Sequence, residues 1–229
     1  MPTKTEPRAP SLSEQAYQEI RTRILDCDLE PGALISERGI AADLGLGIAA
    51  VRSALGRLSA EGLVTTLPRV GYQVANFTIE YINDFFEAWR VVGRAIIQLA
   101  IRRISDADRA VLRDMRERGE GARKGNRAAA IGTADEIFSY YIHVARNPLL
   151  GDFFNRMQAD MHRLYTLVVR SGQGDSLADR MNTAPAFEDF ATEEEALRYF
   201  EEFVDTSQWQ IMSVVLGLPA LSKVSLSFQ

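Results

Sequence analysis

The sequence predicts a mainly α protein that combines an N-terminal winged helix-turn-helix with a C-terminal all-helical bundle. Two observations support this fold class. Helical periodicity in the first third gives way once to a β-rich hairpin pattern around residue 70. From residue 78 to about residue 217 the pattern is helical almost throughout, with Pro148 and Pro185 as the only prolines. We therefore expect a disordered arm at residues 1–10, a winged helix-turn-helix domain at 11–77 and a helical domain at 78–229.

The first helix is expected to begin at Ser11 or Ser13, either of which could serve as its cap, and to end near Asp28. This places Cys27 inside the helix. The dipeptide Pro31-Gly32 predicts a turn, and the run ALIS after it predicts a short extended piece.

A helix-turn-helix follows. Ser36 is expected to cap a second helix that Gly45 ends, and a third helix is expected from Ile48 to Glu61. A break of about three residues between two helices is typical of this motif. The runs LVTTL and YQVANF, separated by Pro-Arg-Val-Gly, then predict a hairpin that would form the wing.

The second domain is expected to contain six helices, because cap or turn residues interrupt its helical pattern five times. Their predicted ranges are 79–103, 105–124, 127–146, 148–172, 176–188 and 192–217. No apolar run approaches the roughly 18 residues that a membrane span needs, so we expect no membrane partner.

Composition excludes several function classes. Of the 229 residues, 46% are hydrophobic and 25% charged, which is typical of a globular protein. One cysteine and two histidines cannot form a disulfide framework or a Cys/His zinc motif, and we expect a cytoplasmic protein. No Gly-rich phosphate loop, GxSxG or HExxH motif occurs, so the sequence does not predict an enzyme.

The net charge of -5 argues against a chain that binds nucleic acid over its whole surface. A local basic face remains compatible with the sequence, because the stretch from Leu44 to Ala60 holds two arginines and no acid. This stretch covers the second helix of the predicted helix-turn-helix.

An ordered series of motifs over about 65 residues resembles the winged-helix domain of GntR-family bacterial transcription regulators. The residues that support the resemblance are Pro31-Gly32, Ser36-Glu37-Arg38, Leu44-Gly45, Val51-Arg52, Arg57-Leu58, Glu61-Gly62-Leu63 and Gly71. The resemblance implies DNA contacts from Arg38, from Arg52 on the recognition helix and from Gly71 at the wing. We add four further candidates from the same two elements, namely Gly47, Ala49, Ser53 and Arg69.

The recognition helix departs from the family pattern. The common run Ser-Arg-Thr-Pro-Val-Arg-Glu-Ala-Leu stands here as Gly47 to Leu55, with Ile48 in place of an arginine. A good arginine contact to a guanine edge contributes roughly 1–3 kcal/mol of discrimination. We therefore expect altered or weak specificity, and an alternative stays open: a degenerate winged helix that acts through dimerisation or a partner without reading operator DNA.

The helical part resembles the FCD domain of the FadR subfamily, on Arg90, Asp135-x-x-Phe138 and Asn147-Pro148-Leu149. The resemblance implies an effector-binding domain, in many members with a metal held by one aspartate and three histidines. The corresponding positions here are Asp135, Ser139, Met181 and Phe203. Two histidines cannot supply three ligands, so we predict no cofactor and a metal-free pocket for a larger, partly hydrophobic ligand. We also consider a two-ligand site of Asp135 and His143, and for Asp135 itself a solvated or capping role.

Two arginines extend the predicted effector site. Arg90 would meet a carboxylate effector bidentately, and Arg94 stands where the family has glutamate, which favours an anionic ligand. The alternative for Arg90 is an ion pair with a neighbouring acid. Together these inferences predict a homodimeric regulator of double-stranded operator DNA whose affinity responds to a small-molecule effector.

Overall fold

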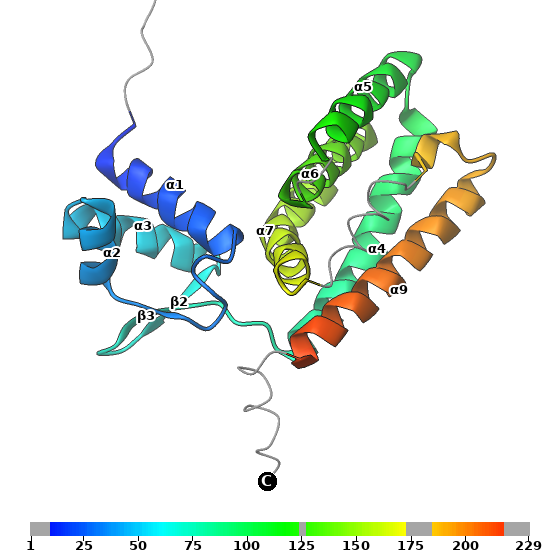
Figure 1. Ribbon diagram of the computed structural model, residues 1–229. Coiled ribbons are helices and arrows are strands. Elements are labelled where there is room, and N and C mark those ends of the chain that lie inside the picture. Colours follow the sequence, from blue (N-terminus) through cyan, green and yellow to red (C-terminus); the bar gives the residue numbers. More distant parts are fainter. Residues whose placement is uncertain (1–9, 124–126, 173–184, 218–229) are drawn as a thin grey trace, which may run out of the picture. The chain divides into compact units, whose positions relative to one another are not determined.

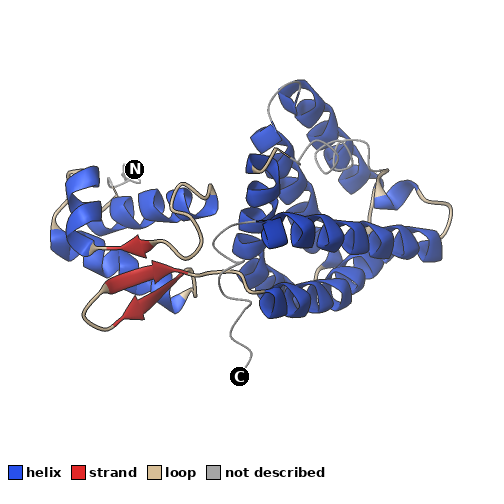
Figure 2. Cartoon of the chain, turned by 60° about the horizontal axis from the view of Figure 1, so that its bottom comes forward, coloured by secondary structure: helices blue, strands red, loops and turns tan. Residues whose placement is uncertain are grey.

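The computed structural model describes residues 10–123, 127–172 and 185–217 (Figure 1). The chain divides into two compact units, Met1–Asn76 and Phe77–Gln229, which we describe separately. Of the predicted disordered arm, residues 1–9 lie outside the described ranges. The first unit contains α1 (Leu12–Leu25), α2 (Glu37–Leu44) and α3 (Ile48–Ala60). Its small antiparallel sheet has the order β1-β3-β2, from Leu34–Ile35, Gly71–Val74 and Val64–Leu67 (Figure 2).

Helix α1 is shorter than the sequence predicts. Ser11 is its cap and accepts a hydrogen bond from the Glu14 amide, but the helix ends at Leu25 and not near Asp28. Cys27 therefore lies outside the helix, with a positive φ of 56°, and its side chain is buried. A residue in the left-handed region cannot continue a right-handed helix, which explains the earlier end.

Helix α2 begins and ends where the sequence predicts, and α3 begins at the predicted Ile48 but ends at Ala60, one residue before the predicted Glu61. The Ser36 hydroxyl accepts a hydrogen bond from the Gly39 amide at 3.0 Å, and Gly45 ends α2 with a φ of 65°. A glycine adopts this left-handed conformation without the steric cost that a side chain would add. Helix α3 then packs on α1 through fully buried side chains of both helices: Ile20, Ile24, Val51, Leu55 and Leu58.

The second unit is helical, which confirms the predicted fold class. It contains α4 (Ile79–Arg103), α5 (Asp106–Arg123), α6 (Arg127–Ala145), α7 (Pro148–Arg170), the 3₁₀ helix η1 (Phe187–Asp189) and α9 (Glu193–Gly217). Residues 176–184 of the helix predicted at 176–188 lie outside the described residues. Its last residues form η1 instead of an α-helical end.

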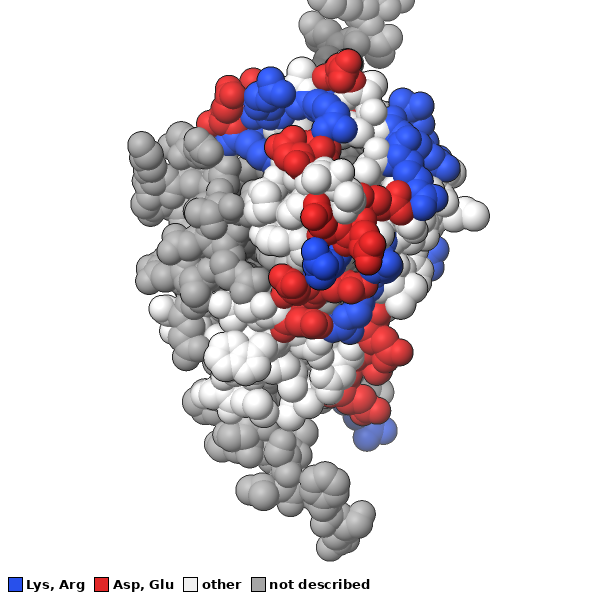
Figure 3. Space-filling view, turned by 90° about the vertical axis from the view of Figure 1, so that its right-hand side faces the viewer, with Lys and Arg blue, Asp and Glu red and all other residues white. Residues whose placement is uncertain are grey.

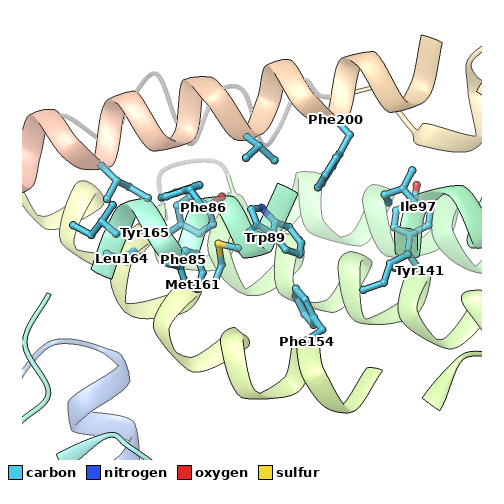
Figure 4. Close-up of a cluster of buried hydrophobic side chains, with 14 of the residues drawn as sticks. Phe85, Phe86, Trp89, Ile97, Tyr141, Phe154, Met161, Leu164, Tyr165 and Phe200 are labelled. Atoms are coloured by element: carbon cyan, nitrogen blue, oxygen red, sulfur yellow. The ribbon is translucent and has the colours of Figure 1, made fainter. Parts of the chain in front are cut away.

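The core of the helical unit is aromatic (Figure 4). Trp89 of α4 lies at its centre, with ring centroids 4.6 Å from Phe138, 5.0 Å from Phe154 and 5.5 Å from Phe200. Gly93, one turn after Trp89, lets α9 approach, because a Cβ there would come within 2.3 Å of the Phe200 ring. Aromatic side chains from α4, α6, α7 and α9 thus fix the arrangement of these four helices.

Within the described ranges, no single helix is both long and apolar enough to cross a membrane. The bent pair α2 and α3 meets the same criteria of length and composition only when the two helices are taken together.

Candidate nucleic-acid interface and effector site

Helix α3 exposes the side chains that the sequence predicts for DNA reading. Ala49, Arg52 and Ser53 are exposed at helical spacing, beside Ile48, whose side chain is 42% exposed. Gly47 is the cap residue and supplies no side-chain hydrogen bond, so no capping side chain occupies the first amides of α3. The helix therefore presents a small-residue surface around one arginine.

Arg52 is held by an acid from the other helix of the motif. Its Nε donates to both carboxylate oxygens of Glu37, at 2.9 and 3.1 Å, and its Nη2 donates to Glu37 Oε2 at 2.7 Å. These bonds lower the pKa of the Glu37 carboxyl, so Glu37 is ionised at neutral pH. The Arg52 side chain nevertheless remains 65% exposed.

The other candidate DNA contacts are differently placed. Arg38 and Arg69 are exposed, and within the described residues neither makes an ion pair. Arg69 lies in the turn between β2 and β3, the two strands of the wing, and has a positive φ of 66°. Gly71 has a φ of 128°, and a Cβ there would lie 2.6 Å from the Ile35 carbonyl oxygen. Pairing of β3 with β1 therefore requires a glycine at residue 71, whether or not it also contacts DNA.

The two candidate arginines of the effector site lie in a row of ion pairs between α4 and α9. Arg90 Nη2 donates to Asp205 Oδ1 at 2.5 Å, and Arg94 donates to Glu201. Further along, Arg102 donates to both oxygens of Glu193 at 2.6 and 2.7 Å. Figure 3 shows basic and acidic side chains side by side on the face of the helical unit that includes α9. Arg90 thus adopts the ion pair that the sequence left open as its alternative, and Arg94 makes an ion pair that the sequence did not predict.

Asp135 and Ser139 face two side chains of α7. Asp135 Oδ2 lies 2.8 Å from His162 Nδ1, and Gln158 Nε2 donates to Ser139 Oγ at 3.3 Å. Asp135 and Ser139 are four residues apart on α6, and Gln158 and His162 are four residues apart on α7. The two residues of each helix therefore share one helix face. We call these four residues the α6–α7 polar seam. The sequence did not indicate Gln158 and His162 as members, although their spacing matches that of Asp135 and Ser139.

The structure brings Asp135 together with His162, and not with His143, the residue considered for a two-ligand site. His143 is exposed with its ring against Tyr140, at 5.7 Å between centroids. Of the two later positions, Met181 lies outside the described residues and Phe203 is half-buried on α9. Over residues 10–123, 127–172 and 185–217, no three His, Cys, Asp or Glu side chains gather as a metal site would require.

A buried arginine on α7 is a site that the sequence did not indicate. Arg163 is fully buried, donates to Asp160 Oδ1 at 2.9 Å, and its guanidinium lies 4.4 Å from the centre of the Phe77 ring. The Tyr81 hydroxyl donates to the same carboxylate. Burial and this hydrogen bond raise the pKa of Tyr81, so the phenol stays protonated. Arg163 and Asp160 thus fasten the first residues of the helical unit to α7.

A second buried network joins α5, α6 and η1. Arg116 Nη1 donates to Glu188 Oε1 at 2.9 Å and its Nη2 donates to the Tyr141 hydroxyl at 2.7 Å, while the Tyr141 hydroxyl donates to Glu188. Burial beside this carboxylate raises the pKa of Tyr141. The network holds η1 against α5 and α6.

Comparisons with known proteins agree with the architecture of both units. Residues 12–74 match the model of "bacterial regulatory proteins, gntR family", and residues 84–188 match that of the FCD domain. The Nta operon transcriptional regulator of Aminobacter aminovorans is 33% identical over 84 residues, which are 37% of this chain and 40% of that protein. The repressor GlaR of Escherichia coli is 29% identical over 94 residues, or 41% of this chain and 43% of GlaR.

A solved structure extends the likeness to both units. The structure of E. coli McbR/YncC has a TM-score of 0.73 and 18% identity, with 89% of this chain and 98% of that chain covered. At this identity the likeness concerns the fold alone. The chain spans less than half the length of the first two relatives, both of which are named as regulators. From the two matched domains, the chain belongs to the GntR family of bacterial regulatory proteins and carries the FCD domain in its helical unit.

Proposed function

We propose that this chain is a DNA-binding transcriptional regulator of the cytoplasm that binds operator DNA as a homodimer and responds to a small-molecule effector. The observation that carries the proposal is the surface of α3: a well-packed helix with an exposed, acid-held Arg52, flanked in the same unit by the exposed Arg38 and Arg69. Arginines that make no ion pair suit phosphate contacts, and a held guanidinium suits a base edge. Two copies related by a two-fold axis would present two such helices to half-sites one helical turn apart.

For the effector we propose the α6–α7 polar seam. Its support is the meeting of two carboxylate or hydroxyl side chains of α6 with the amide and imidazole of α7, which together offer both donors and acceptors. An anionic effector on Arg90 or Arg94 would first have to displace Asp205 or Glu201. At the seam an effector would exchange hydrogen bonds with the Asp135–His162 and Ser139–Gln158 pairs, which offer both donors and acceptors, so a polar effector there is the form of the proposal that we favour.

Helix α7 provides a physical route for the response. Its residues Gln158 and His162 face α6, whereas Arg163 holds Phe77, the first residue of the helical unit. Phe77 directly follows Asn76, the last residue of the DNA-binding unit. An effector that shifts α7 relative to α6 would therefore act on the residue at which the two units join.

A binding experiment tests the DNA part of the proposal. The purified chain is titrated against a fragment from upstream of its own gene and against a shuffled fragment of equal length, at several salt concentrations. We expect tighter binding to the upstream fragment and a steep fall in affinity with salt. Equal, weak binding to both fragments would favour the alternative of a degenerate winged helix that acts through a partner.

A second experiment tests the effector site. Thermal unfolding of the chain is followed with a panel of small carboxylates, hydroxy acids and amino acids, for the wild type, His162→Gln and Arg90→Met. A ligand that binds only the native state raises the Tm, because it stabilises that state by RT ln(1 + [L]/Kd). We expect His162→Gln to abolish the shift and Arg90→Met to retain it. The opposite result would place the effector on Arg90 and contradict the proposed seam.

A further inference from the structure

Helix α2 supplies an acid, Glu37, that is hydrogen-bonded to Arg52 of α3. A guanidinium has five N–H donors arranged along a planar fork. In Arg52 the Nε and Nη2 donors of one edge are used by Glu37. Among the residues that the structure describes, Nη1 has no hydrogen-bond partner. The edge formed by Nη1 and Nη2 is therefore the one left for another acceptor.

That remaining edge has the geometry for a base. The commonest specific contact of arginine in the major groove is a bidentate pair with O6 and N7 of guanine. An exposed arginine is flexible, and ordering it on binding costs side-chain entropy. A bidentate carboxylate fixes the plane of the guanidinium before DNA arrives, so this cost is already met in the free protein.

Glu37 is well placed to hold Arg52. It is the first residue of α2, where the helix dipole favours an acid, and its side chain is only 22% exposed. Its partner is 65% exposed and lies one turn into α3. Glu37, the residue that holds, thus belongs to α2, and Arg52, the residue that is exposed, belongs to the recognition helix. Arg57 differs: it donates to Glu14 and stacks on Tyr17, so it joins α3 to α1.

We propose that Glu37 is a positioning residue for base reading: it holds Arg52 through Nε and Nη2 so that the Nη1–Nη2 edge reads a guanine. This inference rests on the proposed function, since it supposes that α3 enters a major groove. It also predicts opposite effects on two quantities. Removing Glu37 should reduce the preference for guanine, because Arg52 is no longer fixed. It should increase binding to DNA of any sequence, because a negative charge near the phosphates is lost.

The experiment selects binding sequences from a library of randomised duplex DNA, using the full chain and its variants Glu37→Ala, Glu37→Gln and Glu14→Gln. Glu14→Gln is the matched control, because it removes the charge of the other acid that holds an arginine of α3. We expect the wild type and Glu14→Gln to enrich the same motif. For Glu37→Ala we expect the preference for one guanine per half-site to fall by roughly 5- to 150-fold. Glu37→Gln, which keeps one acceptor, should give an intermediate loss.

Affinity for a fixed mixed-sequence duplex is measured in parallel as a function of salt. We expect Glu37→Ala to bind it more tightly than the wild type, with a dependence on salt steeper by up to about one phosphate contact. A variant that is merely unstable would lose both the guanine preference and the affinity for mixed-sequence DNA, and its lowered Tm would identify it. If Glu37→Ala is unstable in this way, Glu37→Gln is used to test the inference. An unchanged guanine preference in a folded Glu37 variant would overturn the inference alone. A wild type that enriches no motif would overturn the proposed function and the inference with it.

Discussion

Arginine serves opposite purposes in the two units. In the N-terminal unit Arg52 is held by Glu37 along one edge and keeps 65% of its side chain exposed. In the helical unit Arg163 makes an ion pair with Asp160, lies over the Phe77 ring and has no exposed surface. Both are paired with a carboxylate at hydrogen-bonding distance, so the pairing alone does not distinguish them. What differs is whether part of the guanidinium remains accessible to a partner.

The ion pairs between α4 and α9 are intermediate between these two cases. Arg90 and Arg94 are partly exposed, at 35% and 45%, but each is paired across the helix interface. Exposed pairs of this kind contribute little to stability, because water screens them and two long side chains must be ordered. Exposure together with an open donor edge, and not the mere presence of an arginine, therefore indicates where a ligand could bind.

The largest expected effect is the loss of the buried arginine. Replacing Arg163 by Met leaves the Asp160 carboxylate without its cation in a mostly buried position. Breaking a buried pair in this way costs about 3–5 kcal/mol of unfolding free energy. Urea unfolding of the full chain measures the loss. Arg156→Met, an exposed position of the same helix, is the control and should change the stability by less than about 0.5 kcal/mol. A loss under about 1 kcal/mol for Arg163→Met would show that the site behaves like an exposed pair.

A second prediction concerns the recognition-helix arginine of the family pattern, which is replaced here by Ile48. Ile48 is the first residue of α3 and is 42% exposed, so an arginine fits there without disturbing the core. We expect Ile48→Arg to tighten binding to a family-like operator by roughly 1–3 kcal/mol per half-site. Fluorescence anisotropy with that operator and with a scrambled one measures the gain. Ala60→Arg, at the other end of α3, adds the same charge and should tighten both equally. If Ile48→Arg also gains equally on both sequences, the first turn of α3 does not read bases.

The sequence predicts the N-terminal unit almost residue by residue, because its signals are local. Ser36 caps α2 and Gly45 ends it, and each acts within one turn of its own position. The same reasoning misplaced Cys27, since no local pattern distinguishes the last helical turn of α1 from the left-handed residue after it. The pairing of Glu37 with Arg52 joins two helices across a turn, so periodicity within either helix does not reveal it.

In the helical unit the sequence predicts the helices but not which of their faces meet. The resemblance to the family indicates a functional role for Asp135, and the same helix offers His143 as a possible partner for it. The structure pairs it with His162 on α7, because the side chains at 135 and 139 face that helix. The row of ion pairs between α4 and α9 was more accessible to prediction. Its arginines and acids both recur at multiples of four residues, which is the spacing that an antiparallel helix pair requires.

The smallest expected effect lies at the end of that row, at Glu193. Hydrogen bonds from Arg102 and Gln98 lower the pKa of this carboxyl from its ordinary 4.5 to about 2. A carboxyl with a lowered pKa in the folded state stabilises the fold above its unfolded pKa, and this stabilisation is lost as the pH falls toward the folded value. We therefore expect Glu193→Gln to lower the Tm by a few degrees at most at pH 7. The difference from the wild type should shrink steadily below about pH 4.5. The neighbouring Glu194→Gln removes the same charge from an exposed position, so a similar pH-dependent difference there would assign the effect to net charge and not to the pair with Arg102.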